Sequence, residues 1–431
     1  MDDKDVPDGS KWLLQVDLQN AFNLVDRTKM MVEVRKHLPD ISHWVESIYG
    51  VEAVLNLGDS TISSSAGVHQ GDPLASLLFS LALLPVVENI VRTVPSLRQN
   101  TWILDDGALG GNKADLQMAI DILIQEGPER GLHLNADKSM VWCPGHDQED
   151  DDPLERGIPR VTKGGVKLLG APVGSQVFET EILVDRIAKL EALLEKLPTL
   201  EDPHTEYVLL KNCFGLPKLS YTMRTVDPRP HQNTLKRFDT GVRQALEREL
   251  GVSLEDHQYF QATLPVSMGG LGVRRVETHS PGAYIASLGA SSDIIEEIVG
   301  RRVEMETKVV GLVSLINTLS GEGELTPEGA LVSTQHAISQ TLDQHQVKLL
   351  QEGLSEVRDK ARVNSVGMLR AGDWLNAAPV RALGLHLRPK EFTAAVKYRL
   401  GIPVYPTAEP CTACGEDSDK FGDHAIGCRK E

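Results

Sequence analysis

The stretch Trp102-Ile-Leu-Asp-Asp-Gly-Ala-Leu-Gly110 is a short apolar run that breaks into two aspartates and glycines. This pattern predicts a β-hairpin that presents Asp105 and Asp106 at its turn. A third carboxylate, Asp17, ends another apolar run, Trp12-Leu-Leu-Gln-Val16, and a helical pattern follows it at once. Two strand ends that deliver carboxylates to one place can hold two divalent cations roughly 3.5–4 Å apart, the usual device for joining a 3′-hydroxyl to an α-phosphate. The alternative is that each acid is a solvated turn residue, because Asp-Asp-Gly is ordinary hairpin chemistry.

Further motifs lie between and after these acids. The segment from Gly67 to Phe79 combines a turn at Gln70-Gly71 with an apolar run, which predicts a buried helix with Pro73 in its first turn. In their order and spacing, five segments of this chain resemble the palm motifs of a reverse transcriptase of the non-LTR retrotransposon type. The five segments are Asp17-Leu-Gln-Asn-Ala-Phe-Asn23, Gln70-Gly-Asp-Pro-Leu74, Leu104-Asp-Asp106, Gly131-Leu-His-Leu-Asn-Ala-Asp-Lys-Ser139 and Leu168-Leu-Gly-Ala-Pro-Val-Gly174.

The resemblance implies a role for each acid. Asp17 and Asp105 are implied to bridge two Mg²⁺ ions, and the backbone carbonyl of Leu18 is implied to be a further oxygen ligand. Asp106 is implied to be a supporting third acid. The resemblance also implies that the template is RNA, that the primer is DNA and that the substrates are deoxynucleoside triphosphates.

Four more residues have a role implied by the resemblance, and two of them also have an ordinary structural explanation. Phe22 stands where the family carries a steric gate against the ribose 2′-hydroxyl, but it also fits the apolar face of a helix. Gln70 and Gly71 are implied to let the backbone approach template and nucleotide closely. Lys138 is implied to neutralise or protonate the departing pyrophosphate, although a lone lysine on a loop is usually solvated.

Two departures from the family pattern count against turnover. The family has an aromatic residue two positions before the first hairpin aspartate, and this chain has Ile103. Relatives carry a fingers region before the position of Asp17, and here only 16 residues precede it. Three functions therefore stay open: an RNA-directed DNA polymerase that a second chain completes with fingers or endonuclease, a nucleic-acid-binding remnant without turnover, and a retroelement relic with no selected activity.

The net charge and the hydropathy of the chain limit the kinds of partner that we expect it to bind. The chain has 44 Lys and Arg against 61 Asp and Glu, a net charge of −17. Because phosphate contacts normally dominate affinity for nucleic acid, we expect weak binding of template-primer unless basic residues gather in one channel. An acidic stretch at 147–155 predicts an exposed loop. The sequence has no uninterrupted apolar run of about 18 residues and no signal peptide, so we expect a cytoplasmic or nuclear protein without a membrane partner.

Two basic segments follow the palm motifs. Helical spacing predicts helices over 179–197 and 206–214. The segment 211–224, where basic and aromatic residues interleave, resembles the family's thumb, and the alternative is a helix-turn-helix with a solvated basic edge. In Gly269-Gly-Leu-Gly-Val-Arg-Arg275, backbone amides and guanidinium groups suit phosphate contacts, and the alternative is a plain turn before a helix. The candidate nucleic-acid-binding residues are Lys211, Lys218, Arg224, Arg274 and Arg275.

The cysteines indicate a separate metal site. Cys411, Cys414, His424 and Cys428 have the spacing Cys-x₂-Cys-x₉-His-x₃-Cys, which suits one tetrahedral Zn²⁺ with its donor atoms within about 4 Å of one another. The tail holds too few apolar side chains for a core, so we expect it to fold only around zinc. The alternative is a group of unligated surface thiols. Cys143 and Cys213 are predicted to be buried or half-buried cysteines without such a role.

The predicted fold class is α+β. A right-hand polymerase palm, an antiparallel sheet with helices, is followed by a mostly helical thumb and connection and by a small zinc knuckle. The predicted domains are 1–175 for the palm without fingers, 176–290 for the thumb-like region, 291–400 for the helical connection and 401–431 for the CCHC zinc knuckle.

Overall fold

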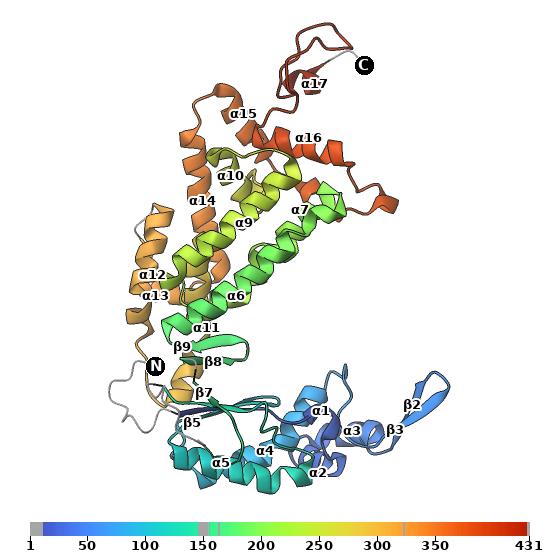
Figure 1. The fold of residues 1–431 in the computed structure, drawn as a ribbon, viewed down its shortest axis with the longest axis vertical. Helices are drawn as coiled ribbons and strands as arrows, with labels where there is room; N and C mark the ends of the chain where they lie inside the picture. The colour runs from blue at the N-terminus through green and yellow to red at the C-terminus, as the bar shows by residue number, and fades with distance from the viewer. Residues whose placement is uncertain (1–11, 145–153, 155, 163, 322–323, 429–431) are drawn as a thin grey trace. The chain divides into compact units, whose positions relative to one another are not determined.

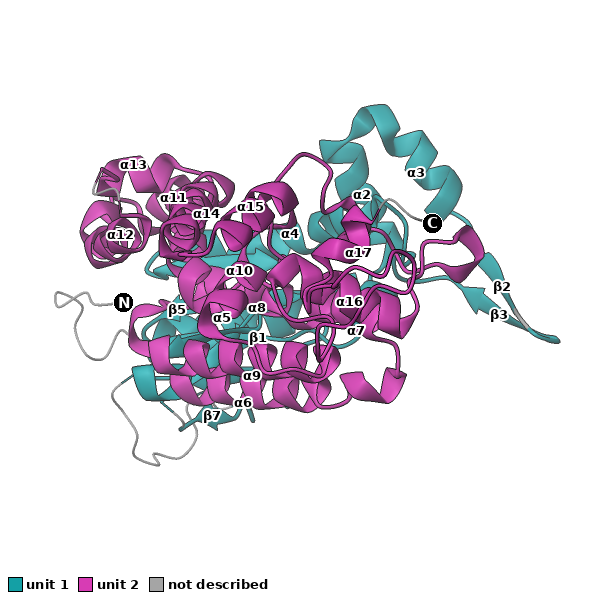
Figure 2. Cartoon of the chain, turned by 90° about the horizontal axis from the view of Figure 1, so that it is seen from above, with its two compact units in different colours: residues 1–179 teal, residues 180–431 magenta. Residues whose placement is uncertain are grey.

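Figure 1 shows the computed structural model, which describes residues 12–144, 154, 156–162, 164–321 and 324–428. The chain divides into two compact units, unit 1 (residues 1–179) and unit 2 (residues 180–431), which Figure 2 shows in different colours. The division lies close to the predicted end of the palm at residue 175. The predicted boundaries at 290 and 400 fall inside unit 2 and stay predictions. Most of the acidic stretch that was expected to be an exposed loop, 147–153 and 155, lies outside the described residues.

Unit 1 is built on a five-stranded sheet with the order β4-β5-β1-β6-β7. Strand β1 runs antiparallel to β5 and to β6, β4 runs antiparallel to β5, and β7 joins β6 in parallel. The sheet is therefore antiparallel as predicted, except at its β7 edge. The strands are β1 (Trp12–Val16), β4 (Gln99–Ile103), β5 (Asp106–Gly111), β6 (Met140–Trp142) and β7 (Arg160–Val161).

Helices supply the rest of the unit 1 core. Leu14 and Val16 of β1 are fully buried in one cluster with Leu78 and Phe79 of α4 and with Ile120 of α5. The helices are α1 (Ala21–Leu24), α2 (Arg27–His37), α3 (Ser42–Tyr49), α4 (Ala75–Thr93) and α5 (Lys113–Glu126). Two small hairpins, β2 (Ala53–Leu57) with β3 (Ser60–Ser64) and β8 (Gly165–Leu168) with β9 (Ala171–Gly174), complete the unit. The β8–β9 hairpin contains the segment that resembles the primer grip.

The apolar run after the Gln70-Gly71 turn forms a helix, as predicted. It begins at Ala75, so Pro73 lies in the turn before the helix, where Asp72 accepts a hydrogen bond from the Leu74 amide, and not in its first turn. Within the described residues, this helix, α4, is long and apolar enough to cross a membrane, with a mean hydropathy of 1.5 over its most apolar window. A core helix passes the same test, and α4 buries eight side chains in the core of unit 1.

Unit 2 is helical in its described part. The predicted helix over 179–197 is α6, and the helix predicted over 206–214 is α7, which continues into a π-helical turn at Leu210–Phe214. The helices are α6 (Gln176–Leu194), α7 (Pro203–Leu209), α8 (Leu216–Thr225), α9 (Gln232–Leu250), α10 (Asp256–Thr263), α11 (Val276–Val299), α12 (Met305–Ser320), α13 (Pro327–Val332), α14 (Gln335–Gly353), α15 (Val357–Val366), α16 (Pro389–Leu400) and α17 (Asp423–Gly427). One hydrophobic cluster joins α6 to α9 and α16, and a smaller one joins α11 to α14.

Candidate active site and metal centre

Strands β4 and β5 form the hairpin that carries the acid doublet. Ile103 pairs with Asp106, so the two turn residues are Leu104 and Asp105. Asp105 is therefore at the tip as predicted, whereas Asp106 is not, because it is the first residue of β5. The register that moves the tip places Gly107 opposite Trp102, where an added Cβ would lie 2.7 Å from the indole ring. Only glycine leaves room for the ring of Trp102 at that position.

The turn has an unusual backbone. Leu104, the first of the two turn residues, has a φ of 58°. A type II′ hairpin turn requires a positive φ at this position, and glycine is the usual residue there. A leucine in this conformation is strained, and such strain tends to occur at functional sites.

The sheet brings the three predicted acids together. Strand β1 pairs with β5 up to Val16 and Gly107, so the next position of the same register sets Asp17 opposite Asp106. Burial, followed by the negative charges of Asp105 and Asp17, raises the pKa of Asp106. Asp105 and Asp17 therefore disfavour the charged form of Asp106, and divalent cations would relieve that repulsion.

The predicted lysine-bearing segment holds Asp17 in place. The Asn135 side chain donates to Asp17 Oδ1 at 2.8 Å, and the Asp17 amide donates to Ser139 Oγ at 3.0 Å. Leu18 and Leu134 face each other in an isolated bridge, whose two hydrogen bonds join Gln19 to His133 and Asn135 to Asp17. That bridge does not use the Leu18 carbonyl, which leaves it available as a ligand. Sequence reasoning missed Asn135 and Ser139.

Gly131 lets this segment approach the first helix. Its φ is 72°, and an added Cβ would lie 1.7 Å from the backbone oxygen of Leu24. Only glycine fits there. Lys138 lies further along the same segment and is exposed, and its ammonium makes no ion pair with a described residue, so its role at pyrophosphate stays a prediction.

Phe22 retains both of its predicted interpretations. Its ring stacks on the buried Phe79 with centroids 4.9 Å apart and an interplanar angle of 11°. The side chain is half-buried, so part of the ring is also open to solvent. Sequence reasoning missed Phe79 as the residue that would hold a gate in position.

Gln70 and Gly71 lie in an exposed turn. Gly71 has a φ of 95°, and an added Cβ would meet no atom within 4 Å, so the turn has open space beside it. Tyr49 supports the turn by a hydrogen bond to the Asp72 carboxylate, and burial together with this bond raises the pKa of Tyr49 to about 12. Arg27 supports it from the other side through the Gly67 carbonyl, at 2.8 Å. Sequence reasoning missed both supports.

The predicted nucleic-acid-binding residues of unit 2 differ in their availability. Lys218 and Arg224 are exposed, and Arg224 donates to the Gln335 side chain. Lys211 is half-buried, and Arg274 is paired with Asp343 inside unit 2. Their contacts with nucleic acid stay predictions, and for Arg274 the pair restricts how it can meet a phosphate.

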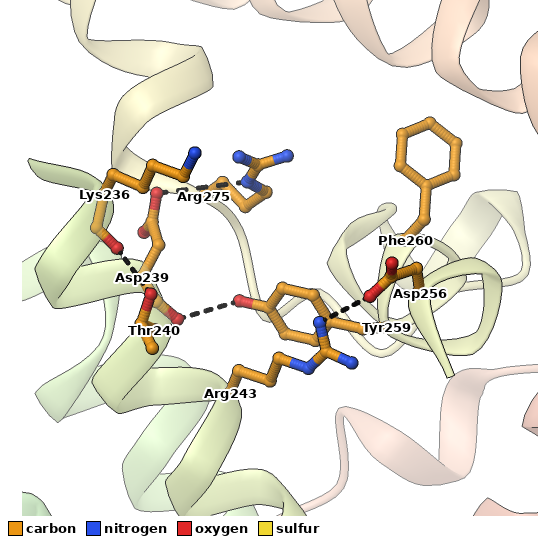
Figure 3. A pocket seen from close by; sticks show the side chains of 8 residues that line it. All are labelled: Lys236, Asp239, Thr240, Arg243, Asp256, Tyr259, Phe260 and Arg275. Carbon is orange, nitrogen blue, oxygen red and sulfur yellow. Dashed lines mark hydrogen bonds and ion pairs between the residues drawn. The ribbon is translucent and has the colours of Figure 1, made fainter. Parts of the chain in front are cut away.

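Arg275 lies at a different hollow from its neighbour, one of about 280 Å³ that Figure 3 shows from close by. Asp239 in this hollow accepts hydrogen bonds from the Val276 and Glu277 amides at 2.8 and 3.0 Å, so it caps α11. Burial raises the pKa of Asp239 to about 6. Arg275 itself pairs with Glu277, and its Nε lies 4.0 Å from Asp239. Both predicted arginines therefore already have acidic partners within unit 2.

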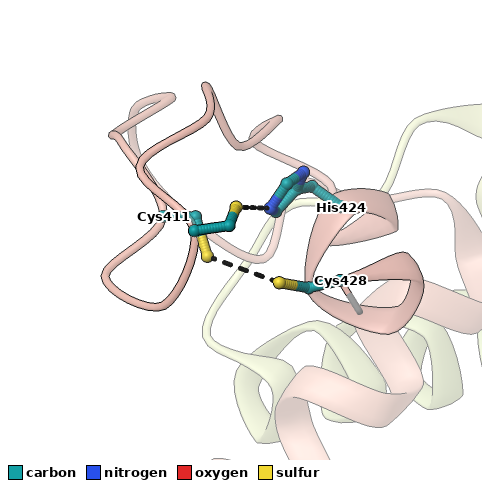
Figure 4. A group of neighbouring side chains, drawn as sticks. Cys411, His424 and Cys428 are labelled. Carbon is teal, nitrogen blue, oxygen red and sulfur yellow. Dashed lines mark hydrogen bonds between the residues drawn. The ribbon is translucent and has the colours of Figure 1, made fainter. Parts of the chain in front are cut away.

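The four predicted zinc ligands converge. Their donor atoms all lie within 4.8 Å of one another, a wider limit than the expected 4 Å. Cys411 Sγ lies 3.9 Å from Cys428 Sγ, and Cys414 Sγ lies 3.2 Å from His424 Nε2. Figure 4 shows Cys411, His424 and Cys428 side by side. Three thiols and one imidazole are the donor set of a structural zinc site, so these residues fit that metal.

Neighbouring groups prepare the knuckle for a cation. Hydrogen bonds from the backbone amides of Cys414 and Ala413 are the main reason that the pKa of Cys411 is lowered to about 6. Asp419 accepts a hydrogen bond from the His424 amide at 2.8 Å, which fixes the start of α17. Of the other two cysteines, Cys143 is buried as predicted, but Cys213 is exposed, because it faces outward from the π-helical turn.

Comparison with known proteins gives one family and one relative. Residues 2–173 match the reverse transcriptase (RNA-dependent DNA polymerase) family. Over 275 residues the chain is 26% identical to the retrotransposable element SLACS 132 kDa protein of Trypanosoma brucei gambiense. The match covers 61% of this chain but 22% of that protein, so the chain spans a small part of its relative.

Two solved structures are similar at a lower level. They are the telomerases of Candida albicans and Candida tropicalis, each determined with a TWJ fragment of telomeric RNA. Their TM-scores are 0.31 and 0.30, at 12% and 9% identity, and the matches cover 68% and 88% of this chain and 51% and 50% of theirs. Scores this low do not establish a common fold.

Proposed function

Residues 2–173 carry a reverse transcriptase-like domain of a retrotransposon, and from this premise we propose that the chain is an RNA-directed DNA polymerase. It would add deoxynucleotides to the 3′-hydroxyl of a DNA primer that is paired with an RNA template. The observation that supports the proposal is the set of three carboxylates at the ends of β1, β4 and β5, where burial, and after it the charges of Asp105 and Asp17, raises the pKa of Asp106.

Asp17 and Asp105 would hold two Mg²⁺ ions, with the Leu18 carbonyl as a further oxygen ligand. Bound there, the ions would activate the primer hydroxyl and stabilise the charge on the triphosphate. Asn135 fixes the orientation of Asp17 through Oδ1, and Oδ2 accepts no hydrogen bond from a described residue. The strand end therefore presents one oriented carboxylate oxygen to a cation. Asp106 would add negative charge without being a constant ligand.

The substrate would contact residues next to these acids. Phe22, which the stack on Phe79 holds in place, would exclude a 2′-hydroxyl and so select deoxynucleotides. The open turn at Gln70 and Gly71 would let template and incoming nucleotide approach the backbone. Lys138, whose ammonium has no acidic partner among the described residues, would give a proton to the departing pyrophosphate.

The knuckle would hold one structural zinc ion through Cys411, Cys414, His424 and Cys428. The fit of the donor set supports this, since the four donor atoms already lie within 4.8 Å of one another. Such a centre has a closed set of protein ligands and does no chemistry itself. It would stabilise the tail against α15, where Arg358 pairs with Asp423 and lies 3.9 Å above the Phe421 ring.

Primer extension on an RNA template tests the polymerase proposal. We expect Asp105→Asn to lower extension by roughly 10²–10³-fold or more, as loss of one group that stabilises transition-state charge does in other enzymes. The matched control is Asp40→Asn, the same change at an exposed aspartate of unit 1, which should leave extension unchanged. Equal extension by Asp105→Asn and the native protein would contradict the proposal.

A second candidate function is binding of nucleic acid without turnover. It is favoured by Ile103, which is 52% exposed where the family carries an aromatic side chain beside the hairpin. The same assay separates the two candidates. Binding of a template-primer by a native protein that extends no primer would support the second one.

A further inference from the structure

Two segments that are far apart in sequence meet at one hollow of unit 2. The π-helical turn Leu210–Phe214 brings Lys211, and the glycine-rich segment 269–275 brings Gly272 and Arg274. The hollow has a volume of about 370 Å³. Its polar lining consists of Lys211, Arg274, Asn212, Ser267 and Asn376, and none of the described side chains that line it is acidic.

Lys211 is a cation without a matching acid. Its ammonium donates to the Leu375 carbonyl at 3.1 Å and to Asn376 Oδ1 at 2.8 Å, and both acceptors are neutral. It makes no ion pair with any carboxylate in the described part of the chain. An ammonium group has three donors, so one remains for a ligand. Burial lowers the pKa of Lys211, which means that the charged form is held at a cost that a bound anion would offset.

The backbone at Gly272 leaves room for the side chain of Lys211. Gly272 has a φ of 73°, and an added Cβ would lie 3.2 Å from Lys211 Cδ, so a larger residue would press on the lysine stem. The ammonium lies 5.4 Å from the centre of the Tyr207 ring, whose hydroxyl donates to the Leu271 carbonyl at 2.6 Å. Lys211 itself lies in a π-helical turn, a distortion that is frequent at functional sites. Gly272 therefore leaves room for the stem of Lys211.

Hydrogen bonds within unit 2 hold the guanidinium group of Arg274 in place. Its Nη2 donates to both oxygens of Asp343, at 2.7 and 2.8 Å, and its Nε donates to His279 at 3.1 Å. These bonds leave Nη1 without a hydrogen bond to a described residue. The charge of Arg274 is matched by Asp343, so Lys211 supplies the unmatched charge and Arg274 a rigid donor.

We propose that this hollow binds a phosphate group of a nucleic-acid strand. Lys211 Nζ and Arg274 would contact the phosphate oxygens, and Asn212 and Ser267 would add neutral donors. The hollow suits an anion because the described residues of its lining include one unmatched cation and a fixed guanidinium but no acidic side chain. The choice of nucleic acid as the source of the phosphate rests on the proposed function.

Protection of Lys211 from acylation tests the proposal on the native full-length chain. The protein is treated with an amine-acylating reagent near neutral pH, with and without a single-stranded oligonucleotide, and modification is followed by peptide mass spectrometry. Lys348, an exposed lysine on α14, is the internal control. We expect acylation of Lys211 to fall in proportion to the bound fraction, measured by fluorescence anisotropy, while that of Lys348 stays constant. A saturating strand that leaves Lys211 fully reactive would overturn the proposal.

A parallel sample with pyrophosphate identifies the source of the phosphate. Protection by both the strand and pyrophosphate supports a phosphate site that takes a strand. Protection by pyrophosphate alone would overturn the strand as the ligand. If the oligonucleotide protects Lys211 in a protein that extends no primer, this proposal stands and the polymerase proposal fails. If the protein extends primers but strands never protect Lys211, only the present proposal fails.

Substitution gives a second measurement. Lys211→Met keeps an apolar stem in the hollow and removes the charge, and Lys348→Met removes the same charge elsewhere. One lost phosphate contact should weaken binding of a single strand by about fivefold near 0.1 M salt and reduce the slope of log K against log salt by about 0.7. Lys348→Met should change neither quantity. Equal effects of the two variants would show that only net charge matters and would overturn the site.

Discussion

The acid cluster of unit 1 and the thiol cluster of unit 2 are both candidate metal sites, but they are built in opposite ways. Asp17 follows strand β1, and Asp105 lies in the turn before strand β5; Leu14 and Val16 of β1 and Leu109 of β5 are buried in the core. The candidate zinc ligands all lie between Cys411 and Cys428, where Ile426 is 68% exposed. In unit 1 the packed core positions the carboxylates, and a metal would bind to a site that is already formed. In the knuckle, we expect a bound metal to supply the folding free energy that a core supplies in unit 1.

The largest expected effect is therefore that of zinc removal on the knuckle. Zinc binding contributes about 10 kcal/mol or more to the folding of such sites, so chelation should unfold residues 411–428 and leave unit 1 intact. Hydrogen exchange measured by mass spectrometry should show fast exchange in the knuckle and unchanged protection in β1 and β5. The purified protein should contain about one zinc per chain, and Cys213→Ser, which removes a thiol outside the cluster, should keep it.

A knuckle that stays protected after complete chelation would contradict this prediction. Its order would then come from contacts such as the Arg358 pair with Asp423 and the stacking of Arg358 on Phe421. That result would place the knuckle in the same class as unit 1, in which packing creates the site.

Substitution of Phe22 tests how far the unit 1 site depends on the packing of the core. Phe22→Ala removes a half-buried ring from its stack on Phe79, so it should destabilise the protein by roughly 1–3 kcal/mol, less than the 3–5 kcal/mol of a fully buried aromatic. In the same variant, incorporation of ribonucleotides should rise relative to deoxynucleotides. Denaturant unfolding and a competition assay with the two nucleotides measure the two effects. A loss of stability with an unchanged ratio would assign Phe22 to the core alone.

The sequence predicted those parts of both sites that depend on local signals. An acid at the end of an apolar run, a doublet before glycine and a Cys-x₂-Cys spacing indicated Asp17, Asp105 and the four Cys and His residues whose donor atoms the structure places near one another. The hairpin tip was misplaced by one residue, because the fit of Trp102 over Gly107 across the strands sets the register.

The sequence alone could not predict contacts between segments that lie far apart along the chain. Asn135 and Ser139 contact Asp17 from 118 and 122 residues away, and Arg274 pairs with Asp343 across 69 residues. A periodic pattern or a motif gives no information about such partners, because the tertiary fold alone brings them together. For this reason the sequence identified Lys211 and Arg274 as basic residues without predicting that they share a hollow.

The smallest expected effect concerns the charge of the acid cluster. The pKa of Asp106 is raised, so folding favours its protonated form. This contribution to stability is fully present below the unfolded pKa, near 3.9, and it is lost as the pH rises through the higher folded value. At pH 7 without metal, Asp106→Asn should therefore stabilise the protein, and by less than about 1 kcal/mol, because solvent screens a partly exposed group.

Magnesium distinguishes this acid from one that merely happens to be buried. Glu249 of unit 2 is buried, and burial raises its pKa well above the ordinary value, so Glu249→Gln should also stabilise the metal-free protein at pH 7. Bound Mg²⁺ would reduce the charge repulsion around Asp106. It would not change the burial that raises the pKa of Glu249. Millimolar Mg²⁺ should therefore cancel or reverse the gain from Asp106→Asn and leave that from Glu249→Gln unchanged, as measured by urea unfolding with and without the metal. If Mg²⁺ affects the two variants equally, the acids of unit 1 do not act as a cation site. The acid cluster of unit 1 could then no longer be compared with the knuckle as a second metal site.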